Sequence, residues 1–311
     1  MNYSENITAK VIADSISNEG IRMTTMEIEY PRFILAELNT HRMLSKNSAS
    51  SRAIPQAAMH QQIEARPAGP VWWGKNQPGM QAKEEVTGTD LTDAQFIWHR
   101  AMQDALHWAK ALGGRVGLHK QIANRVTEPW MTMKTVISGT EWANFFYLRA
   151  HPDAQPEIHE LAIKMQEAMN SSTPQLLHPG EWHVPYVNTY RDTRTGELHY
   201  LDSQDHYLDQ ETALHISASC CAQVSYRKND DSPDKARKIF DQLIHSKPAH
   251  ASPVEHQATP MEDSYYETWA DDPQHLQQFG VTHMDSKLQL WSGNLRGWIQ
   301  HRKLIAGEAQ W

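Results

Sequence analysis

The sequence predicts a mixed α/β fold, and two observations carry that prediction. Residues 7–14 and 21–29 are short β-compatible runs, separated by an Asn-Glu-Gly turn signal at 18–20. Residues 92–169 instead carry mostly helical patterns. With 311 residues, of which 40% are hydrophobic and 21% charged, the chain can bury a substantial core. We therefore expect a single elaborated domain over residues 1–311.

The other elements follow in chain order. Pro31 is placed to open an amphipathic helix that ends at His41-Arg42, and a polar, Ser-rich stretch follows it. Residues 67–92 are rich in Pro and Gly, which predicts a long loop or lid. Helices are expected at 92–112, 119–126, 131–150, 154–169, 211–224, 233–246 and 287–303. Residues 172–209 are expected to be irregular or β, and 257–285 acidic and irregular.

Charge and cysteine content exclude several classes of protein. The net charge of −8 argues against non-specific nucleic-acid binding, although it permits a local basic pocket for a phosphate. Cys220 and Cys221 are adjacent, so no disulfide framework is expected and a reducing compartment is favoured. No apolar stretch approaches 18 residues, and the N-terminus lacks the layout of a signal peptide. We expect a cytoplasmic protein without a membrane or nucleic-acid partner.

The densest candidate for function is the string THRMLSKNSASSR, residues 40–52. It places arginines beside Ser and Asn donors, a combination that suits an anionic group such as phosphate. The alternative is a solvated Ser-rich loop with incidental charge. A second adjacent His-Arg pair occurs at 301–302, either by coincidence or as a degenerate copy.

This string resembles the signature of the flavin-dependent thymidylate synthases, an Arg-His-Arg motif continued by x-x-Ser-x-Asn-Glu-x-Ser-x-Arg. The matching residues are His41, Arg42, Ser45, Asn47, Ser50 and Arg52. The preceding EIEYPRFILAELNTHR also resembles the family's strand, proline and amphipathic helix. Further resemblances are IANRVTEP, EWANFFYLRAHPDAQPEI, AQVSYRK (222–228) and HASPVEH (250–256).

The order of these blocks differs from the usual family order. In the family, the VSY and SPFEH blocks, which AQVSYRK and HASPVEH resemble, normally precede the His-Arg motif. Here they follow the helical segment. The resemblance therefore implies a circularly permuted flavin-dependent thymidylate synthase fold, a twisted sheet with helices. Permutation is tolerated where the original termini lie close together. We expect residues 54–110, 172–210 and 257–290 to be insertions or lid segments.

The resemblance implies FAD, NADPH and methylenetetrahydrofolate as cofactors and a pyrimidine deoxynucleoside monophosphate as substrate. The leading reaction is methylation of dUMP to dTMP. The alternative is 5-hydroxymethylation of dCMP or dUMP on the same scaffold. Such a reaction needs no cysteine nucleophile, because the cofactors carry the hydride and the carbon. The resemblance also implies a homotetramer with active sites between subunits.

Individual roles are carried over from the matching family positions. Arg149 is expected to be catalytic, because a cation there would face the negative charge that develops on the pyrimidine. The expected substrate-binding residues are Glu37, Ser48, Ser50, Arg52, Arg125, Leu148 and Arg149. Of these, Arg52 and Arg125, with Ser50, are expected to hold the nucleotide phosphate. The expected cofactor-binding residues are His41, Arg42, Asn47, Asn144, Ser225, His250 and Ser252. The alternatives are a helix-terminal cation for Arg149, a surface ion pair for Arg125 and an exposed helix position for Glu37.

Four positions depart from the family pattern. Thr40 replaces an Arg, Ser48 a Glu, Glu37 a Gln and Ser138 an Asn. Because these changes alter nucleotide and flavin contacts, the choice between uracil and cytosine stays open. Two other classes of protein are possible: a zinc enzyme, suggested by the 18 histidines, and a non-catalytic binding module. The histidine spacings lack the i, i+4 pattern of a helical zinc motif, so no metal is expected.

Overall fold

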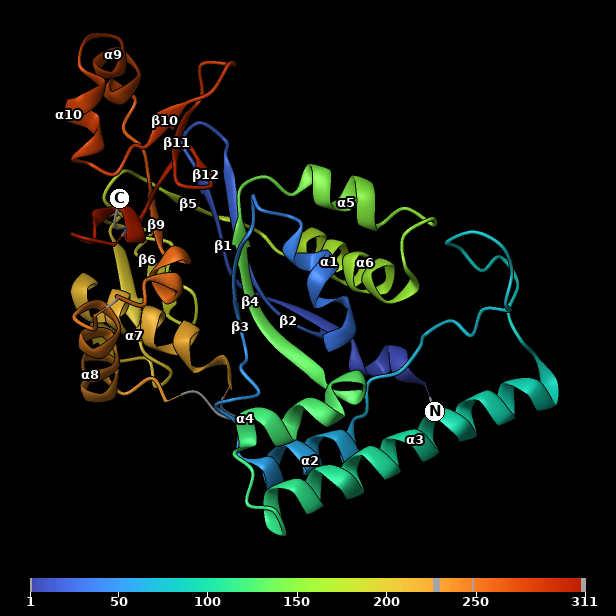
Figure 1. Cartoon of the computed structure of the whole chain (residues 1–311). Helices are drawn as coiled ribbons and strands as arrows, with labels where there is room; N and C mark the ends of the chain where they lie inside the picture. Colours follow the sequence, from blue (N-terminus) through green and yellow to red (C-terminus); the bar gives the residue numbers. More distant parts are fainter. Residues whose placement is uncertain (1, 226–229, 248, 309–311) are drawn as a thin grey trace.

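A computed structural model describes residues 2–225, 230–247 and 249–308. Its centre is a five-stranded sheet in the order β3-β4-β2-β1-β5. The strands are β1 (Thr8–Ser17), β2 (Arg22–Pro31), β3 (Ser45–Ser48), β4 (Thr132–Gly139) and β5 (Gln175–Leu177). All neighbours pair antiparallel except β1 and β5, which pair parallel. The mixed α/β fold is therefore confirmed (Figure 1).

The first two strands form the hairpin that the sequence predicts. Gly20 sits in the turn at a φ of 78°, a conformation that glycine adopts without steric cost. The chain then enters a short 3-10 turn (Arg32–Ile34) and helix α1 (Leu35–Asn39), so the helix expected after Pro31 is present but brief. The Ser-rich stretch begins as the edge strand β3, which the sequence did not indicate.

Helices cover both faces of this sheet (Figure 1). On one face lie α1, α5 (Ala143–Arg149) and α6 (Pro156–Asn170), and on the other α7 (Gln210–Ala222) and α8 (Pro233–Ile244). Side chains of strand β4 pack against the helices on both faces of the sheet. Ile137 joins the core with Phe145 and Leu161, whereas its neighbour Val136 packs against Cys221 on the opposite side.

The helix expected at 131–150 is wrong. Residues 132–139 form β4, and only Ala143–Arg149 are helical. Nearly every residue of β4 is buried, because the strand is covered on both faces. A continuously buried strand has no period-2 alternation, so its pattern cannot be told from that of a buried helix.

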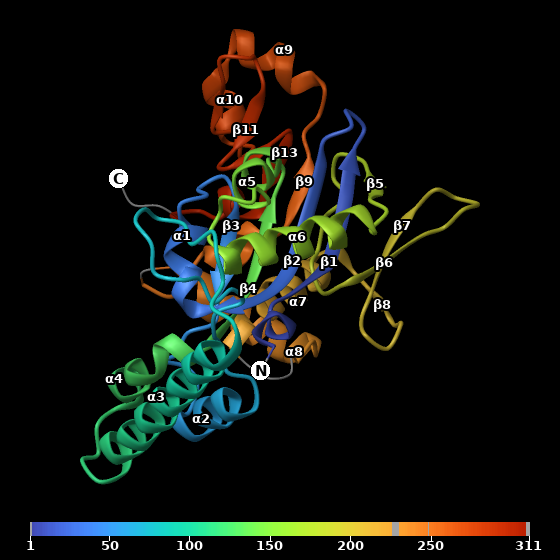
Figure 2. The ribbon, with the colours of Figure 1, turned by 90° about the vertical axis from the view of Figure 1, so that its right-hand side faces the viewer.

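One end of the sheet carries a helical projection, clearest in Figure 2. It consists of α2 (Gln56–Ala65), α3 (Gly88–Gly114), α4 (Lys120–Ala123) and a 3-10 segment (Asn124–Trp130). Met59, Ile63, Met102, Leu106 and Met131 form its own apolar cluster. The helix predicted at 92–112 is confirmed and is longer than expected, and 119–126 is divided between α4 and the 3-10 segment.

The regions expected to be irregular or β contain small sheets. A three-stranded sheet is formed by β6 (Asn188–Arg191), β7 (Leu198–Leu201) and β8 (Tyr207–Leu208). The helices predicted at 154–169, 211–224 and 233–246 are confirmed by α6, by α7 with the short 3-10 turn Gln223–Ser225, and by α8.

The C-terminal part differs most from the prediction. It contains β9 (Ala258–Pro260), α9 (Ser264–Asp271), α10 (Pro273–Gln277), β10 (His283–Met284), β11 (Leu290–Ser292), β12 (Leu295–Arg296), β13 (Trp298–Gln300) and a 3-10 turn, His301–Leu304. The helix expected at 287–303 is wrong. Gly293 and Gly297 adopt φ values of 59° and 68°, so the chain reverses in short strands instead of continuing as a helix. Within the described residues, none of the helices is long and apolar enough to cross a membrane.

Candidate functional site

The centre of the candidate site is a contact between His41 and Arg149. Arg149 ends α5, and His41 follows Thr40, the residue that caps the end of α1. The Arg149 Nε–H donates to His41 Nε2 at 2.9 Å, and Nη2 donates to Thr40 Oγ1 at 3.4 Å. The His41 ring also packs edge-on against Phe145, with 4.9 Å between ring centroids. The fold thus joins two sequence blocks that the sequence analysis singled out separately.

His41 is held in its neutral form. Burial, together with the nearby charges of Arg149 and Lys46, lowers the pKa of His41 to about 4. A neutral imidazole can accept a hydrogen bond at Nε2, which an imidazolium cannot. His41 therefore orients Arg149 without repelling it. The two bonds to Arg149 use only part of a guanidinium that carries five N–H donors, so donors are left for a ligand.

Strand β3 connects this pair to the VSY block. The Asn47 side-chain amide donates to the Cys221 carbonyl at 2.5 Å, and the Ser50 backbone N–H donates to Ser225 Oγ at 2.9 Å. The Lys46 ammonium donates to the carbonyls of His41 and Leu44 at 2.5 and 2.8 Å. Burial lowers the pKa of Lys46 to about 8, against an opposing effect of Glu255.

The two arginines expected to bind phosphate lie on neighbouring segments. Asn124 is buried, and its amide donates to the carbonyls of Ser51 and Ile54 at 3.0 and 3.3 Å, which fixes the loop of Arg52 against the segment of Arg125. Arg52 is exposed. The Arg125 side chain is 60% exposed and forms an ion pair with Glu128 at 3.4 Å, the alternative that the sequence left open. An exposed pair of this kind is weak, so the guanidinium can be recruited by a phosphate.

The altered positions around the motif differ in their surroundings. One carboxyl oxygen of Glu37, Oε2, is buried and has no hydrogen-bond partner within the described part of the chain. Ser48 Oγ lies 2.8 Å from Thr135 Oγ1. Ser138 is wholly internal, since its hydroxyl contacts Thr25 Oγ1 and His256 Nδ1 at 2.6 and 2.8 Å. Glu37 alone of these presents an unsatisfied buried polar atom, a feature that calls for a partner.

The remaining predicted residues lie on the surface. Asn144 and Leu148 are exposed on α5, and His250 and Ser252 are exposed beside the 3-10 turn Ser252–Glu255. Among the residues that the structure describes, the side chains of Asn144, His250 and Ser252 form no hydrogen bond with another side chain. Asn144 and Leu148 share α5 with Arg149, whereas within the described residues no hydrogen bond links His250 or Ser252 to the His41–Arg149 pair.

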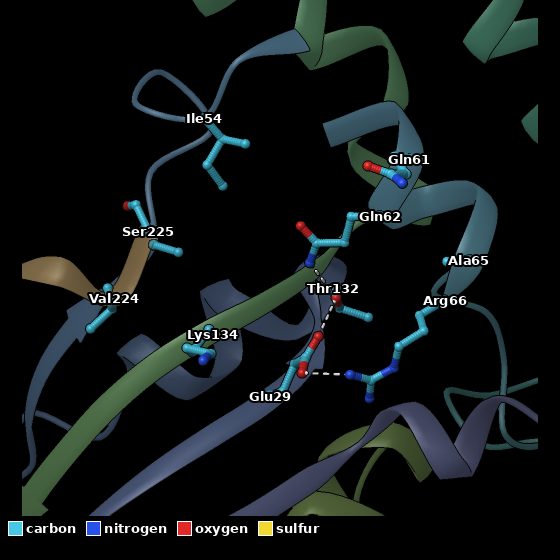
Figure 3. A pocket seen from close by; sticks show the side chains of 11 residues that line it. Glu29, Ile54, Gln61, Gln62, Ala65, Arg66, Thr132, Lys134, Val224 and Ser225 are labelled. Atoms are coloured by element: carbon cyan, nitrogen blue, oxygen red, sulfur yellow. Dashed lines mark hydrogen bonds and ion pairs between the residues drawn. The ribbon is translucent and has the colours of Figure 1, made fainter. Parts of the chain in front are cut away.

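Two open cavities flank β3. The first has a volume of about 390 Å³ and is lined by Glu29, Ala49, Ile54, Gln61, Gln62, Ala65, Arg66, Thr132, Lys134, Val224 and Ser225. Figure 3 shows Glu29 at its floor, contacted by Arg66 at 3.1 Å and by the Thr132 hydroxyl at 2.7 Å. Ala49 and Ile54, which flank the Ser50–Arg52 segment in the sequence, line this cavity, whereas Ser50, Arg52 and Arg125 are not among its lining residues.

The second cavity has a volume of about 410 Å³ and lies at the other end of β3. It is lined by Asn39, Arg42, Leu44, Ser45, Lys46, Glu255, Gly293, Asn294, Gln300, Arg302 and Lys303. Sequence reasoning identified Arg42 but missed Lys46, Asn294, Arg302 and Lys303. The repeated His-Arg pair was the signal that could have led to Arg302.

The family described as thymidylate synthase complementing protein matches residues 21–175, about half of the chain. The chain belongs to this family. The match contains the His-Arg motif, Arg125 and the block that ends in Arg149, and it confirms the resemblance to flavin-dependent thymidylate synthases. It ends before the VSY and SPVEH blocks, which the fold nevertheless places against β3. Membership of the thymidylate synthase complementing protein family supports a transferase that methylates C5 of a pyrimidine nucleotide.

Two crystal structures of the UMP/dUMP methylase PolB from Streptomyces cacaoi were also matched. The one bound with 5-Br UMP has a TM-score of 0.44 and 19% identity, covering 52% of this chain and 87% of that chain. The one bound with 5-Br dUMP has a TM-score of 0.43 and 18% identity, covering 52% and 89%. A comparison with curated proteins gave no match.

Proposed function

We propose that this protein transfers a one-carbon unit from methylenetetrahydrofolate to C5 of a pyrimidine deoxynucleoside monophosphate in a flavin-dependent reaction, with dUMP methylated to dTMP as the leading reaction. The observation that carries the proposal is the Arg149–His41 contact inside the family-matching region. It supplies a fixed cation next to the signature motif.

Arg149 is proposed to act on the pyrimidine ring. Negative charge develops on the ring as C5 becomes nucleophilic, and a preorganised guanidinium stabilises that charge without reorganising. One well-placed donor of this kind contributes about 3–4 kcal/mol to transition-state stabilisation in other enzymes. Because neutral His41 accepts from Nε, it limits the rotation of the guanidinium and aims the remaining N–H groups. His41 is therefore a positioning residue for Arg149.

The nucleotide phosphate is assigned to Arg52 and Arg125, with Ser50. Both guanidinium groups are exposed, and the segments that carry them are joined by the buried Asn124. A phosphate would gain charge-assisted hydrogen bonds from both arginines. Ser48 and Leu148 are proposed as further substrate contacts, as the family pattern implies.

The residues around the motif fit a flavin dinucleotide. The cavity beside Arg42 offers guanidinium, ammonium and hydroxyl donors from Arg42, Lys46 and Ser45, which suits a phosphate-bearing cofactor. The proposed flavin-binding residues are His41, Arg42, Asn47, Asn144, Ser225, His250 and Ser252. Bound FAD would supply hydride, with methylenetetrahydrofolate supplying the carbon and NADPH the reducing equivalents.

The exposure of Asn144, His250 and Ser252 supports a homotetramer with sites between subunits. Cofactor residues that lie on the surface of one chain can be completed by a second copy. Light scattering of the purified protein tests this: we expect a tetramer, and a monomer with full FAD occupancy would contradict it.

A second reaction, 5-hydroxymethylation of dCMP, is favoured by Glu37. Its buried Oε2 has no partner among the described residues, and leaving such an atom unpaired is unfavourable. Cytosine carries an exocyclic amine, which can donate a hydrogen bond to a carboxylate. Uracil presents a carbonyl oxygen at the same position, which cannot donate one. A Glu in place of the family's Gln would therefore favour the binding of cytosine over uracil.

Mass spectrometry of the product decides between the two. Purified protein is given dUMP or dCMP with methylenetetrahydrofolate, with and without NADPH. Methylation of dUMP that requires NADPH is the expected result. A strong preference for dCMP, or a product heavier than the methylated nucleotide by one oxygen atom, would overturn it. Glu37→Gln is the matched variant: if Glu37 selects the base, the ratio of dCMP to dUMP turnover falls in this variant.

A further inference from the structure

Helix α3 presents an apolar face that the described part of the chain leaves uncovered. One side of the helix packs against α2, α4 and the 3-10 segment, and there Met102, Leu106 and Ala109 are buried. Figure 1 shows α3 along the outer edge of the projection, with α2 and α4 between it and the sheet. On the outward side, Ile97 is 65% exposed and Trp108 is 57% exposed. Large apolar side chains that recur along one exposed helix face indicate a contact surface for another molecule.

The outward face follows a seven-residue repeat along the helix. Its positions are spaced alternately by four and three residues, which places them in one stripe along an α-helix. The stripe begins at Asp90 and ends at Arg115, and Ile97 and Trp108 are its two large apolar members. Arg115 directly follows α3 and keeps a helical backbone conformation. A stripe with this spacing is the surface that packs against a second helix in a coiled coil.

The stripe is complementary to itself when it is read in the opposite direction. Suppose that a second copy of α3 lies antiparallel, with the midpoints of the two stripes superposed. Ile97 then faces Trp108 of the partner subunit, and Ala94 faces Ala111 of the partner subunit. Each contact occurs twice, as two-fold symmetry requires. The two large side chains therefore meet each other, and the small ones meet where the helices approach closely.

The charges of the stripe match the same arrangement. Asp90 would face Arg115 of the partner subunit at both ends of the paired helices. Both side chains are exposed, and within the described ranges neither forms an ion pair. Near the middle, Asp104 pairs with Arg100 of its own helix at 3.5 Å, and an antiparallel partner brings a second such pair beside the first. Opposite charges therefore meet at both ends and at the centre.

A parallel pair is disfavoured by the same residues. In a parallel pair each position meets its own copy, so Asp90, Asp104 and Arg115 would each face an identical charge. Like charges that face each other across an interface are destabilising. A second, antiparallel copy of this chain is the occupant that supplies the apolar and the charged halves of the repeat at once.

We propose that two copies of this chain associate through an antiparallel pairing of α3 along this stripe. The pairing buries Ile97 against Trp108 of the partner subunit and joins the helical projections of two subunits. It supplies one interface of the homotetramer proposed above. The tetramer rests on the proposed function, whereas the pairing of two copies depends on neither flavin nor nucleotide, so a failure to find turnover would leave it unaffected.

Sedimentation velocity over a series of protein concentrations tests the pairing. Ile97→Glu places a carboxylate against the partner's Trp108 twice, so we expect it to weaken association about a hundredfold and to halve the mass of the complex. Phe96→Glu is the matched control. Phe96 is 67% exposed, but it lies about 100° around the helix from Ile97 and outside the stripe, so association should not change. Thermal unfolding checks that both variants keep the fold.

Charge reversal tests the direction of the two helices. Asp90→Arg brings two arginines together at each end of the antiparallel pair and should weaken association about tenfold. Adding Arg115→Asp to the same chain restores opposite charges, so the double variant should recover the parent affinity. A parallel pair would instead keep identical charges opposite each other in the parent and in both variants, and none of them would differ.

Cysteine cross-linking tests the register. Because Ala94 and Ala111 would face each other across the pair, the double variant Ala94→Cys/Ala111→Cys should form disulfides between subunits under mild oxidation, and neither single variant should. The native Cys220 and Cys221 are buried and are not expected to react. Cross-linking of the single variants, a parent that stays monomeric, or a parent that associates no more tightly than Ile97→Glu would overturn the proposal.

Discussion

His41–Arg42 and His301–Arg302 are the same dipeptide in two different environments. Both imidazoles are buried, at 8% and 9% exposure, and both have a pKa lowered to about 4. His41 lies against a cation and accepts a hydrogen bond from Arg149. His301 lies among aromatic rings, stacked on Phe240 at 5.9 Å and edge-on to Trp182 at 5.4 Å, and its Nδ1 is buried without a partner among the described residues.

This contrast shows that the dipeptide alone has no fixed role. A neutral histidine beside an arginine orients a charge, whereas a neutral histidine among aromatic rings fills space. We therefore expect His41 to matter for turnover and His301 for stability. The arginines that follow them, Arg42 and Arg302, line one cavity.

The largest effect is expected for Arg149→Ala. Removal of the guanidinium should lower kcat by about 10²–10³-fold while the fold and flavin binding are kept, because Arg149 acts on charge that develops in the transition state. Steady-state kinetics and flavin absorbance measure the two properties. Turnover at the parent rate would show that the His41–Arg149 pair is only structural.

The next effect concerns the other histidine. His301→Ala should lower the free energy of unfolding by about 3 kcal/mol, since it leaves a cavity between Phe240 and Trp182. His301→Phe is the matched control: it keeps the ring and removes the unpartnered nitrogen, and it should change stability by less than about 1.5 kcal/mol. Urea denaturation measures both variants. If His301→Phe loses as much free energy of unfolding as His301→Ala, the ring nitrogens of His301, rather than its shape, stabilise the fold.

The lowered pKa values predict how stability depends on pH. The folded pKa of His301, about 4, lies below the ordinary value of 6.5, so the unfolded chain binds the proton more readily. The contribution of His301 is complete above pH 6.5 and is lost as the pH falls towards 4. At pH 5 the parent should have lost about 2 kcal/mol through this residue, and His301→Phe should be spared that loss. Urea denaturation at pH 7 and pH 5 measures the free energy of unfolding of the parent and of His301→Phe. An equal loss of stability in both proteins at pH 5 would contradict this prediction.

The smallest effect is expected at the exposed arginines. Arg52→Ala and Arg125→Ala should each weaken the binding of a nucleoside monophosphate about tenfold, the equivalent of about 1.4 kcal/mol, and should leave binding of the nucleoside unchanged. Isothermal titration with dUMP and deoxyuridine compares the two. Equal affinity of parent and variants for dUMP would remove these arginines from the phosphate site.

Local signals were sufficient for much of the fold. The hairpin of β1 and β2 follows from a glycine turn between two β-compatible runs, and α3, α6, α7 and α8 follow from helical periodicity. The signature around His41 and Arg42, with the block that ends in Arg149, is sufficient to identify the family.

The errors occur where tertiary burial replaces local pattern. Strand β4 is covered on both faces, so its hydrophobic pattern cannot be told from that of a buried helix. The segment 287–303 has apolar spacing that fits a helix, but the left-handed conformations of Gly293 and Gly297 break it into short strands. Gly297 also lies so close to Ile21 that an added Cβ would meet its side chain at 2.3 Å, a constraint set by a segment far away in the sequence.

The sequence by itself determined the family and the residue types of the motif, since these depend on neighbours along the chain. Only the tertiary structure decided that His41 accepts from Arg149, that Asn124 fixes the loop of Arg52, and that Arg42 shares a cavity with Arg302. The physical reason is that hydrogen bonds, charge neighbours and burial act through space. Identical His-Arg pairs acquire different roles because β-strands and helices from distant segments bring an arginine to one histidine and aromatic rings to the other.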